Sequence, residues 1–143
     1  MKKVIVGLLV CCFLLGCNGA IIVRRVTTYY YLVAIDAEEQ LALSYAIGGD
    51  GSDINYIITQ TVFAVGCDSN YLIAKQHPSK SGNPFVENKS ITNYYIVHLN
   101  KEYDAFKSTV GLIGPLTKDE FYKKRKELNI EDIKFTIVYK NLE

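Results

Sequence analysis

The N-terminal segment constrains this chain most, because a long apolar run follows two lysines. Residues Val4–Val23 contain no charged side chain, and Lys2 and Lys3 precede them. A short basic start followed by an apolar stretch such as Val4–Leu15 is typical of a signal peptide. We therefore expect the N-terminus to direct export of the chain.

A lipid-attachment motif follows the apolar stretch. The residues Leu14-Leu15-Gly16-Cys17 resemble the bacterial lipobox, although Leu15 stands where Ala, Ser or Thr is more common. Gly16 leaves room for a peptidase at the backbone, and the Cys17 thiol is the group that carries a thioether-linked diacylglycerol. A third chain of the palmitate type on the new amine strengthens the anchor, since each buried CH₂ contributes roughly 0.8 kcal/mol. We predict cleavage between Gly16 and Cys17, and lipid anchoring to a membrane of the bacterial cell envelope.

Two other interpretations of this segment stay open. Val4–Val23 is long enough to cross a hydrocarbon core of roughly 30 Å as an uncleaved signal anchor, with Arg24 and Arg25 behind it. Secretion without a lipid is the other interpretation. Gly16 and Asn18 interrupt the apolar run where a cleavage site belongs, and this favours cleavage.

The remaining residues have the size and charge of one soluble domain. We expect a signal peptide at 1–16, a lipid-anchored tether at 17–26 and a single globular domain at 27–143. Removal of residues 1–16 takes Lys2 and Lys3 from the 16 basic residues and leaves 14 against 15 acidic ones. A body so close to neutral argues against a nucleic-acid partner.

The cysteines predict a domain without a disulfide. Cys11 and Cys12 lie in the signal peptide, and acylation occupies Cys17, so Cys67 has no intramolecular partner. Cys67 is then either a small buried hydrophobe or a reactive thiol.

Segments rich in β-branched and aromatic residues predict an extended chain. The expected strands are Thr27–Ile35, Leu41–Tyr45, Ile54–Val65, Tyr71–His77, Ile91–Leu99 and Phe135–Tyr139. Gly66–Asn70 is expected to turn the third strand into a hairpin with the fourth. Gly48–Asp53 and Pro78–Ser90 are expected to be exposed loops, because Gly, Pro, Ser and Asn gather there.

One helix is expected near the C-terminus, after Gly114-Pro115 has ended any preceding strand. Thr117 and Glu120 have the spacing of a capping box, and Leu116 and Phe121 have that of a hydrophobic staple. Asn129 suits the left-handed position that ends a helix. The fold class is therefore α+β: a mostly antiparallel β-sheet with one C-terminal capped helix packed on one face, followed by a final strand. The other face is expected to be solvated.

Residues with catalytic or metal-binding chemistry are few. His77 and His98 have no metal-like spacing to each other or to Cys67, and a zinc site needs three or four converging ligands. No phosphate loop or dinucleotide motif is visible, so we expect neither a metal nor a cofactor. The basic run Lys123–Lys126 is expected to be a solvated helix face.

The tyrosines are the other unusual feature of the composition. The chain contains eleven, with Tyr94 and Tyr95 adjacent, and no tryptophan. Because adjacent strand residues point to opposite faces, we expect one ring of such a pair in the core and one outside. Exposed tyrosines on a sheet serve as binding surfaces for glycans, peptides or proteins.

Several motifs, taken in order, resemble a known family. They are YLIAKQHP at Tyr71–Pro78, YYIV at Tyr94–Val97, GPLTKDEF at Gly114–Phe121 and the basic stretch Lys124–Leu128. This set is similar to a family of small bacterial lipoproteins that is a domain of unknown function, over about Gly48–Ile133. The resemblance implies a lipoprotein without an established activity, so it assigns no catalytic residue.

Three functions follow as hypotheses. The first is a non-enzymatic envelope lipoprotein that binds a protein or peptide through an exposed sheet face and the Pro78–Ser90 loop. The second is a small-ligand or glycan-binding lipoprotein that uses Tyr94 or Tyr95 for stacking, with His77 as a further binding residue.

The third hypothesis is a cysteine-dependent hydrolase. It requires Cys67 to lie beside His77 or His98, since a thiol nucleophile is activated by an adjacent base. Only a three-dimensional structure shows whether these side chains converge.

Overall fold

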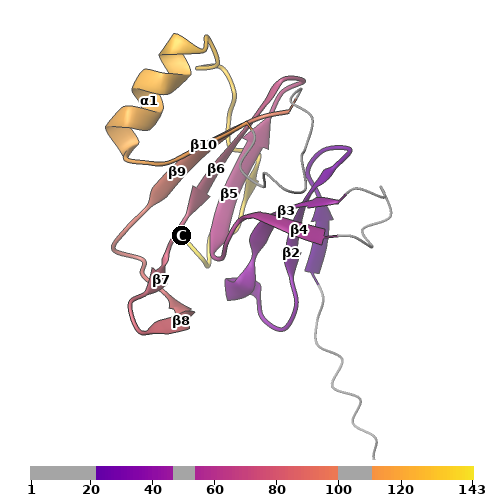
Figure 1. The fold of residues 1–143 in the computed structure, drawn as a ribbon, viewed down its shortest axis with the longest axis vertical. Helices are drawn as coiled ribbons and strands as arrows, with labels where there is room; N and C mark the ends of the chain where they lie inside the picture. Colours follow the sequence, from indigo (N-terminus) through magenta and orange to yellow (C-terminus); the bar gives the residue numbers. More distant parts are fainter. Residues whose placement is uncertain (1–21, 47–53, 100–110) are drawn as a thin grey trace, which may run out of the picture.

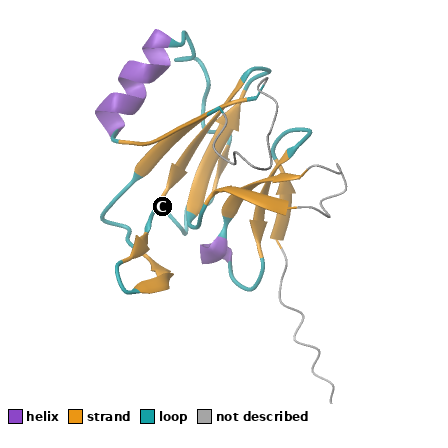
Figure 2. Cartoon of the chain, viewed as in Figure 1, coloured by secondary structure: helices purple, strands orange, loops and turns teal. Residues whose placement is uncertain are grey.

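The computed structural model describes residues 22–46, 54–99 and 111–143, and the description below is confined to them (Figure 1). These residues form two antiparallel sheets, a small hairpin, one α-helix and one short 3-10 helix (Figure 2). The signal peptide, the lipobox and the Gly48–Asp53 loop of the sequence analysis lie outside the described residues.

The first sheet, called here the N-terminal sheet, is a meander of four antiparallel strands in the order β1-β2-β3-β4. Its strands are β1 (Ile22–Arg25), β2 (Tyr30–Ala34), β3 (Ala42–Ala46) and β4 (Ile54–Ile58). The 3-10 helix η1 (Glu38–Gln40) connects β2 to β3.

The second sheet, called here the central sheet, has five strands in the order β10-β9-β6-β5-β11. These strands are β5 (Val62–Cys67), β6 (Tyr71–Gln76), β9 (Asn93–His98), β10 (Leu112–Leu116) and β11 (Ile137–Val138). A separate hairpin of β7 (Ser79–Lys80) and β8 (Asn83–Glu87) lies between β6 and β9 in the sequence, and the helix α1 (Lys118–Glu127) lies between β10 and β11.

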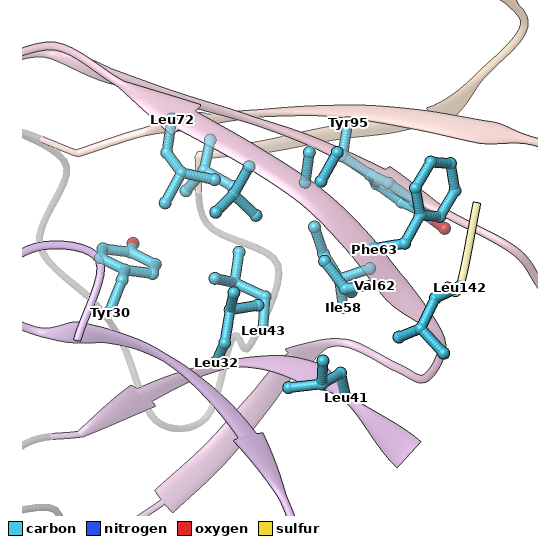
Figure 3. Close-up of a cluster of buried hydrophobic side chains, with 14 of the residues drawn as sticks. Tyr30, Leu32, Leu41, Leu43, Ile58, Val62, Phe63, Leu72, Tyr95 and Leu142 are labelled. Atoms are coloured by element: carbon cyan, nitrogen blue, oxygen red, sulfur yellow. The ribbon is translucent and has the colours of Figure 1, made fainter. Parts of the chain in front are cut away.

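The main core fills the space between the two sheets. Apolar side chains of both sheets face one another there, as Figure 3 shows for Leu32 and Leu43 of the N-terminal sheet opposite Leu72 of the central sheet. All three of these side chains are fully buried. Strands β2 and β3 each contribute every second side chain to this core, because alternate residues of a strand point to the same face.

A second core lies on the opposite face of the central sheet, where α1 packs. Phe121 of α1 is fully buried and contacts the ring of Tyr94, with 4.9 Å between ring centroids. The other buried residues of this cluster are Ile73 and Ile96 of the sheet and Ile130 and Ile133 after the helix. The molecule is thus a three-layer α+β domain in which the central sheet is covered on both faces.

The helix forms as its end signals predict. The Thr117 hydroxyl accepts a hydrogen bond from the Glu120 amide, and the Glu120 carboxylate accepts one from the Thr117 amide at 2.8 Å. Leu116 and Phe121 both join the second core, and Asn129 takes the left-handed conformation with φ of 55°. The predicted α+β class, the C-terminal capped helix and the final strand are therefore confirmed.

The expectation of a solvated second face is wrong. A mostly antiparallel sheet often leaves one face in water, but here the strands divide into two sheets that pack on each other. The predicted strand Ile54–Val65 accounts for the difference. It is divided into β4 in one sheet and β5 in the other, and residues 59–61 connect them.

Three boundaries also differ from the sequence expectations. Strand β1 lies within the expected tether at 17–26, because its pairing with β2 orders it. Strand β10 continues through Gly114-Pro115, which an edge strand with an irregular register tolerates. The Pro78–Ser90 segment contains the β7–β8 hairpin and is otherwise as exposed as predicted, with Phe85 at 75% exposure.

Candidate functional site

The outer face of the N-terminal sheet, which points away from the central sheet, is the candidate site (Figure 1). Leu43 of β3 and Leu41, which precedes the strand, point into the main core, so Ala42 and Ser44 point to the opposite, outer face. Both are buried on that face, at 3% and 0% exposure. The neighbouring strand β4 places Tyr56 opposite Ser44 on this outer face. A row of small residues therefore runs beside larger apolar ones.

A hollow with a volume of about 150 Å³ opens at one end of this outer face. Its lining residues are Ile35, Gln40, Ala42, Tyr56, Thr59 and Gln60. Ile35 and Tyr56 are half exposed, at 50% and 49%, although both are large and apolar. A cavity of about 150 Å³ holds a group the size of benzene, so the hollow fits one aromatic or aliphatic side chain.

Hydrogen bonds fix the polar part of the rim. The Gln40 Oε1 accepts a hydrogen bond from the Asp36 amide at 3.2 Å. The Thr59 carbonyl and hydroxyl both accept from the Gln76 Nε2 at 3.2 Å, which ties the end of β4 to the central sheet. The hollow is thus preformed between rigid elements, as binding sites usually are.

Strand β4 is an edge of its sheet within the described part of the chain. An edge strand presents unpaired backbone N–H and C=O groups, to which an extended peptide can add as a further strand. Alternate side chains of such a peptide would point to the same face as Tyr56. The edge and the hollow together suit recognition of an extended protein segment.

Cys67, His77 and His98 do not converge. Cys67 ends β5 and packs against the main core, whereas His77 follows the opposite end of β6. His98 pairs with Tyr71 and tilts against that ring, which packs on the helix side of the sheet. The pairing that the hydrolase hypothesis needs is therefore not formed.

The Cys67 thiol is also poorly disposed to react. Partial burial raises its pKa, and the neighbouring Asp68 carboxylate raises it further. A raised pKa lowers the fraction of thiolate, which is the reactive form. Cys67 does line a second hollow of about 420 Å³, between the β1–β2 and β5–β6 turns, together with Val26, Thr27, Thr28, Tyr29, Tyr30, Asp68, Ser69 and Leu99.

The prediction that one ring of the Tyr94-Tyr95 pair is exposed is wrong. Tyr94 lies under α1 and Tyr95 lies in the main core, at 9% and 8% exposure. Both are buried because the central sheet is covered on both faces, and burial raises the pKa of each phenol. Neither ring offers a surface on which a sugar could stack.

His77 is buried as well, so it is not a surface binding residue. Its ring stacks on Phe63 with 4.3 Å between centroids, and its Nδ1 lies 2.7 Å from the Ile91 carbonyl oxygen, to which it donates. This contact joins the end of β6 to the start of β9. The structure gives His77 a role in packing.

The expectation for Lys123–Lys126 is wrong at Arg125, which is 5% exposed. Its guanidinium donates to the carbonyls of Ile130, Glu131 and Ile133, at distances between 2.6 and 3.3 Å. The three lysines remain at the surface or its margin. Sequence patterns do not distinguish one buried cation in such a run.

No group of three His, Cys, Asp or Glu side chains among the described residues is placed to hold a metal ion. None of the helices within the described ranges has the length and apolarity needed to span a membrane.

The residues of the outer-face hollow were not identified from the sequence. The alternation of Leu41 and Leu43 with Ala42 and Ser44 was visible, but it did not show that small residues would leave a hollow. That result depends on Ile35, which follows β2, and on Tyr56 of β4.

Comparison with known proteins identifies the family alone. No curated protein and no solved structure matches the chain. A family model described as "Protein of unknown function (DUF3997)" matches residues 27–139, which is most of the chain and nearly all of the described structure. The chain therefore belongs to the DUF3997 family of proteins of unknown function.

Proposed function

We propose that this protein is a lipid-anchored component of the bacterial cell envelope that binds a protein or peptide segment through the outer face of its N-terminal sheet. The observation that supports this function best is the hollow at Ile35, Ala42 and Tyr56, beside the edge strand β4. The support for the anchor is the lipobox sequence ending at Cys17.

The size of the hollow favours a side chain over a free small molecule. Ligand sites usually enclose about 300–1,000 Å³, which is well above the 150 Å³ of this hollow. A peptide needs only a pocket for one anchoring side chain, because backbone hydrogen bonds along β4 add to the affinity.

Site-specific photo-crosslinking in intact cells tests the proposed surface. A photoreactive phenylalanine analogue at position 56 should give a discrete adduct, whereas the same analogue at position 122 should not. Tyr122 is a matched control, since it is 49% exposed like Tyr56 but lies on α1.

Filling the hollow sharpens this test. Ala42→Leu places a larger side chain on its floor and should reduce the adduct at position 56 by at least several-fold. Equal adducts at positions 56 and 122, or an adduct at position 56 that is unchanged by Ala42→Leu, would contradict the proposed surface.

The anchor needs a separate measurement. Mass spectrometry of the mature N-terminus should find an acylated Cys17 and no residue before it. A chain that keeps Met1–Leu15 would indicate an uncleaved signal anchor instead of a lipoprotein. A cleaved but unmodified N-terminus would indicate a secreted protein without a lipid.

A second candidate function is binding of a small polar ligand. The 420 Å³ hollow beside Cys67 supports it, because this volume lies within the range of ligand sites and Thr27, Asp68 and Ser69 supply polar groups. A thermal-shift screen with sugars and cell-wall fragments tests it, since a ligand that binds only the folded state raises the melting temperature. A Thr27→Val variant that keeps such a shift unchanged would contradict the assignment to this hollow.

A further inference from the structure

The distance between the proposed lipid and the folded body is short. Only residues 18–21 separate Cys17 from Ile22, where β1 begins. Five peptide units span at most about 18 Å. A compact body of the described size has a radius of gyration of roughly 13 Å, so a lipid on Cys17 keeps the start of β1 close to the bilayer.

The start of β1 lies at a defined end of the molecule. Ile22 pairs with Ala34, the last residue of β2, and the chain continues from there through Ile35 to η1. The β7–β8 hairpin contacts η1, and the two are further connected by Asn141, which donates to Glu38 and accepts from Lys89. In Figure 1 this end occupies the lower half of the view, and α1 lies at the top.

Exposed apolar side chains lie on more than one element at this end. Phe85 of β8 is 75% exposed and is the most exposed large apolar residue that the structure describes. Val23 of β1 is also half exposed, at 53%, and Val86 of β8 is exposed at 36%. Water-exposed rings of this kind are stabilised when they enter the headgroup region of a bilayer.

We propose that this end of the protein rests on the membrane that carries the Cys17 lipid, with the Phe85 ring inserted into the bilayer interface. The proposal rests on the lipid anchor of the proposed function. One aromatic ring binds a bilayer weakly, but the anchor already holds the protein there. The ring then only selects the orientation, in which α1 points away from the membrane.

The charges at this end favour an apolar contact over an electrostatic one. The cations here are Lys80 in the hairpin, Lys89 after it and Arg24 near the start of β1. The acidic residues are Glu87 of β8 and Asp36, Glu38 and Glu39 in and beside η1. Such a mixed surface has no excess of cations with which to attract anionic headgroups. The contact is therefore expected to form equally on neutral and on anionic lipid.

Tryptophan fluorescence tests this orientation directly, because the chain has no tryptophan of its own. The full-length lipidated protein carrying Phe85→Trp is reconstituted into phosphatidylcholine vesicles with bromine atoms on the acyl chains near the headgroups. We expect at least a two-fold loss of fluorescence relative to unbrominated vesicles, with or without phosphatidylglycerol. Tyr122→Trp, on α1, should lose almost none.

The other outcomes overturn the proposal in distinguishable ways. Equal quenching of both variants, or none at position 85 in a vesicle-bound protein with acylated Cys17, refutes the orientation while the anchor stands. A blue-shifted but unquenched emission at position 85 assigns Phe85 to a protein contact instead. A protein whose Cys17 is unmodified by mass spectrometry refutes the anchor and the orientation together.

Discussion

Gly66 occupies a position in β5 where the chain leaves no space for a side chain. A Cβ atom on Gly66 would lie 1.8 Å from the Lys134 carbonyl oxygen and 3.2 Å from the Phe135 Cα. Real Cβ atoms essentially never approach closer than 3.0 Å, so Gly66→Ala forces the 134–135 backbone to move by more than 1 Å. The clashing atoms belong to the backbone, so a change of side-chain rotamer cannot relieve the clash.

The displaced segment is held on both sides of Lys134. The Thr136 amide donates to the Val65 carbonyl at 3.0 Å, and the Ile133 carbonyl accepts from Arg125 at 2.6 Å. Overpacking costs about 1–3 kcal/mol, and each weakened hydrogen bond adds about 1 kcal/mol or more. We expect Gly66→Ala to lower the free energy of unfolding by about 3–5 kcal/mol, a large part of the 5–15 kcal/mol typical of a domain.

Denaturant titration followed by circular dichroism measures this loss. Gly82→Ala is the matched control, since it also removes a glycine but has no atom within 4 Å of the new Cβ. Its positive φ of 80° makes alanine unfavourable by roughly 1–2 kcal/mol. A Gly66→Ala variant that is no less stable than Gly82→Ala would refute the argument from close approach.

Three further predictions concern the helix start and the buried tyrosines. Gly114→Ala should cost about 2–3 kcal/mol in denaturant titrations, because its Cβ would lie 2.6 Å from the Tyr95 ring and its φ is 135°. The amide and hydroxyl of Thr117 hold the pKa of Glu120 below its usual 4.5. The ionised Glu120 carboxylate therefore stabilises the fold above pH 4.5, and this stabilisation is lost as the pH falls through the lower pKa of the folded state. Glu120→Gln should reduce the dependence of the unfolding free energy on pH in this acidic range. Burial raises the pKa of Tyr94 and Tyr95 above the usual 10, so the unfolded state loses these protons first and stability should fall above pH 10, as ultraviolet titration of the phenols can follow.

The helix was predictable because its signals are local. The capping box, the hydrophobic staple and the left-handed Asn129 all lie within the segment Leu116–Asn129. Each depends on residues three to five positions apart, so the sequence alone determines them.

The division into two sheets was not predictable in the same way. Ile54–Val65 is β-prone on both sides of Thr59-Gln60-Thr61, and this short polar stretch does not show whether the chain changes sheets there or continues as one strand. The change depends on pairing with strands far along the chain: β4 with β3, and β5 with β6 and β11. The burial of both Tyr94 and Tyr95 follows from this arrangement, since a strand covered on both faces has no exposed side.

The candidate site depends on the same non-local packing. Ile35 and Tyr56 are twenty-one positions apart in the sequence, and only the β2-β3-β4 order places them around Ala42. Phe85 was expected to be exposed because it lies in Pro78–Ser90. The connection of its hairpin to η1 near the start of β1 required the structure.

Arg125 is the residue whose role differs most from its sequence context, and the difference can be measured. Its buried guanidinium donates to three backbone carbonyls after α1, those of Ile130, Glu131 and Ile133. It also lies 5.3 Å from the Phe121 ring centroid. Removing a donor leaves buried carbonyls unpaired, at about 1–3 kcal/mol for each group. Arg125→Met keeps the apolar length of the side chain but should therefore lower the free energy of unfolding by about 2–4 kcal/mol, depending on how far water reaches these carbonyls.

Lys123→Met is the matched control on the same helix, because Lys123 is exposed. A surface substitution of this kind should stay within about 0.5 kcal/mol of the parent protein. Arg125→Lys separates charge from geometry: it keeps the cation but lacks the planar fork of donors, and it should be nearly as destabilised as Arg125→Met. Equal stability of Arg125→Met and Lys123→Met would mean that the four basic residues form one solvated face after all. A large loss confined to position 125 would show that this side chain stabilises the segment after α1, which also covers Gly66.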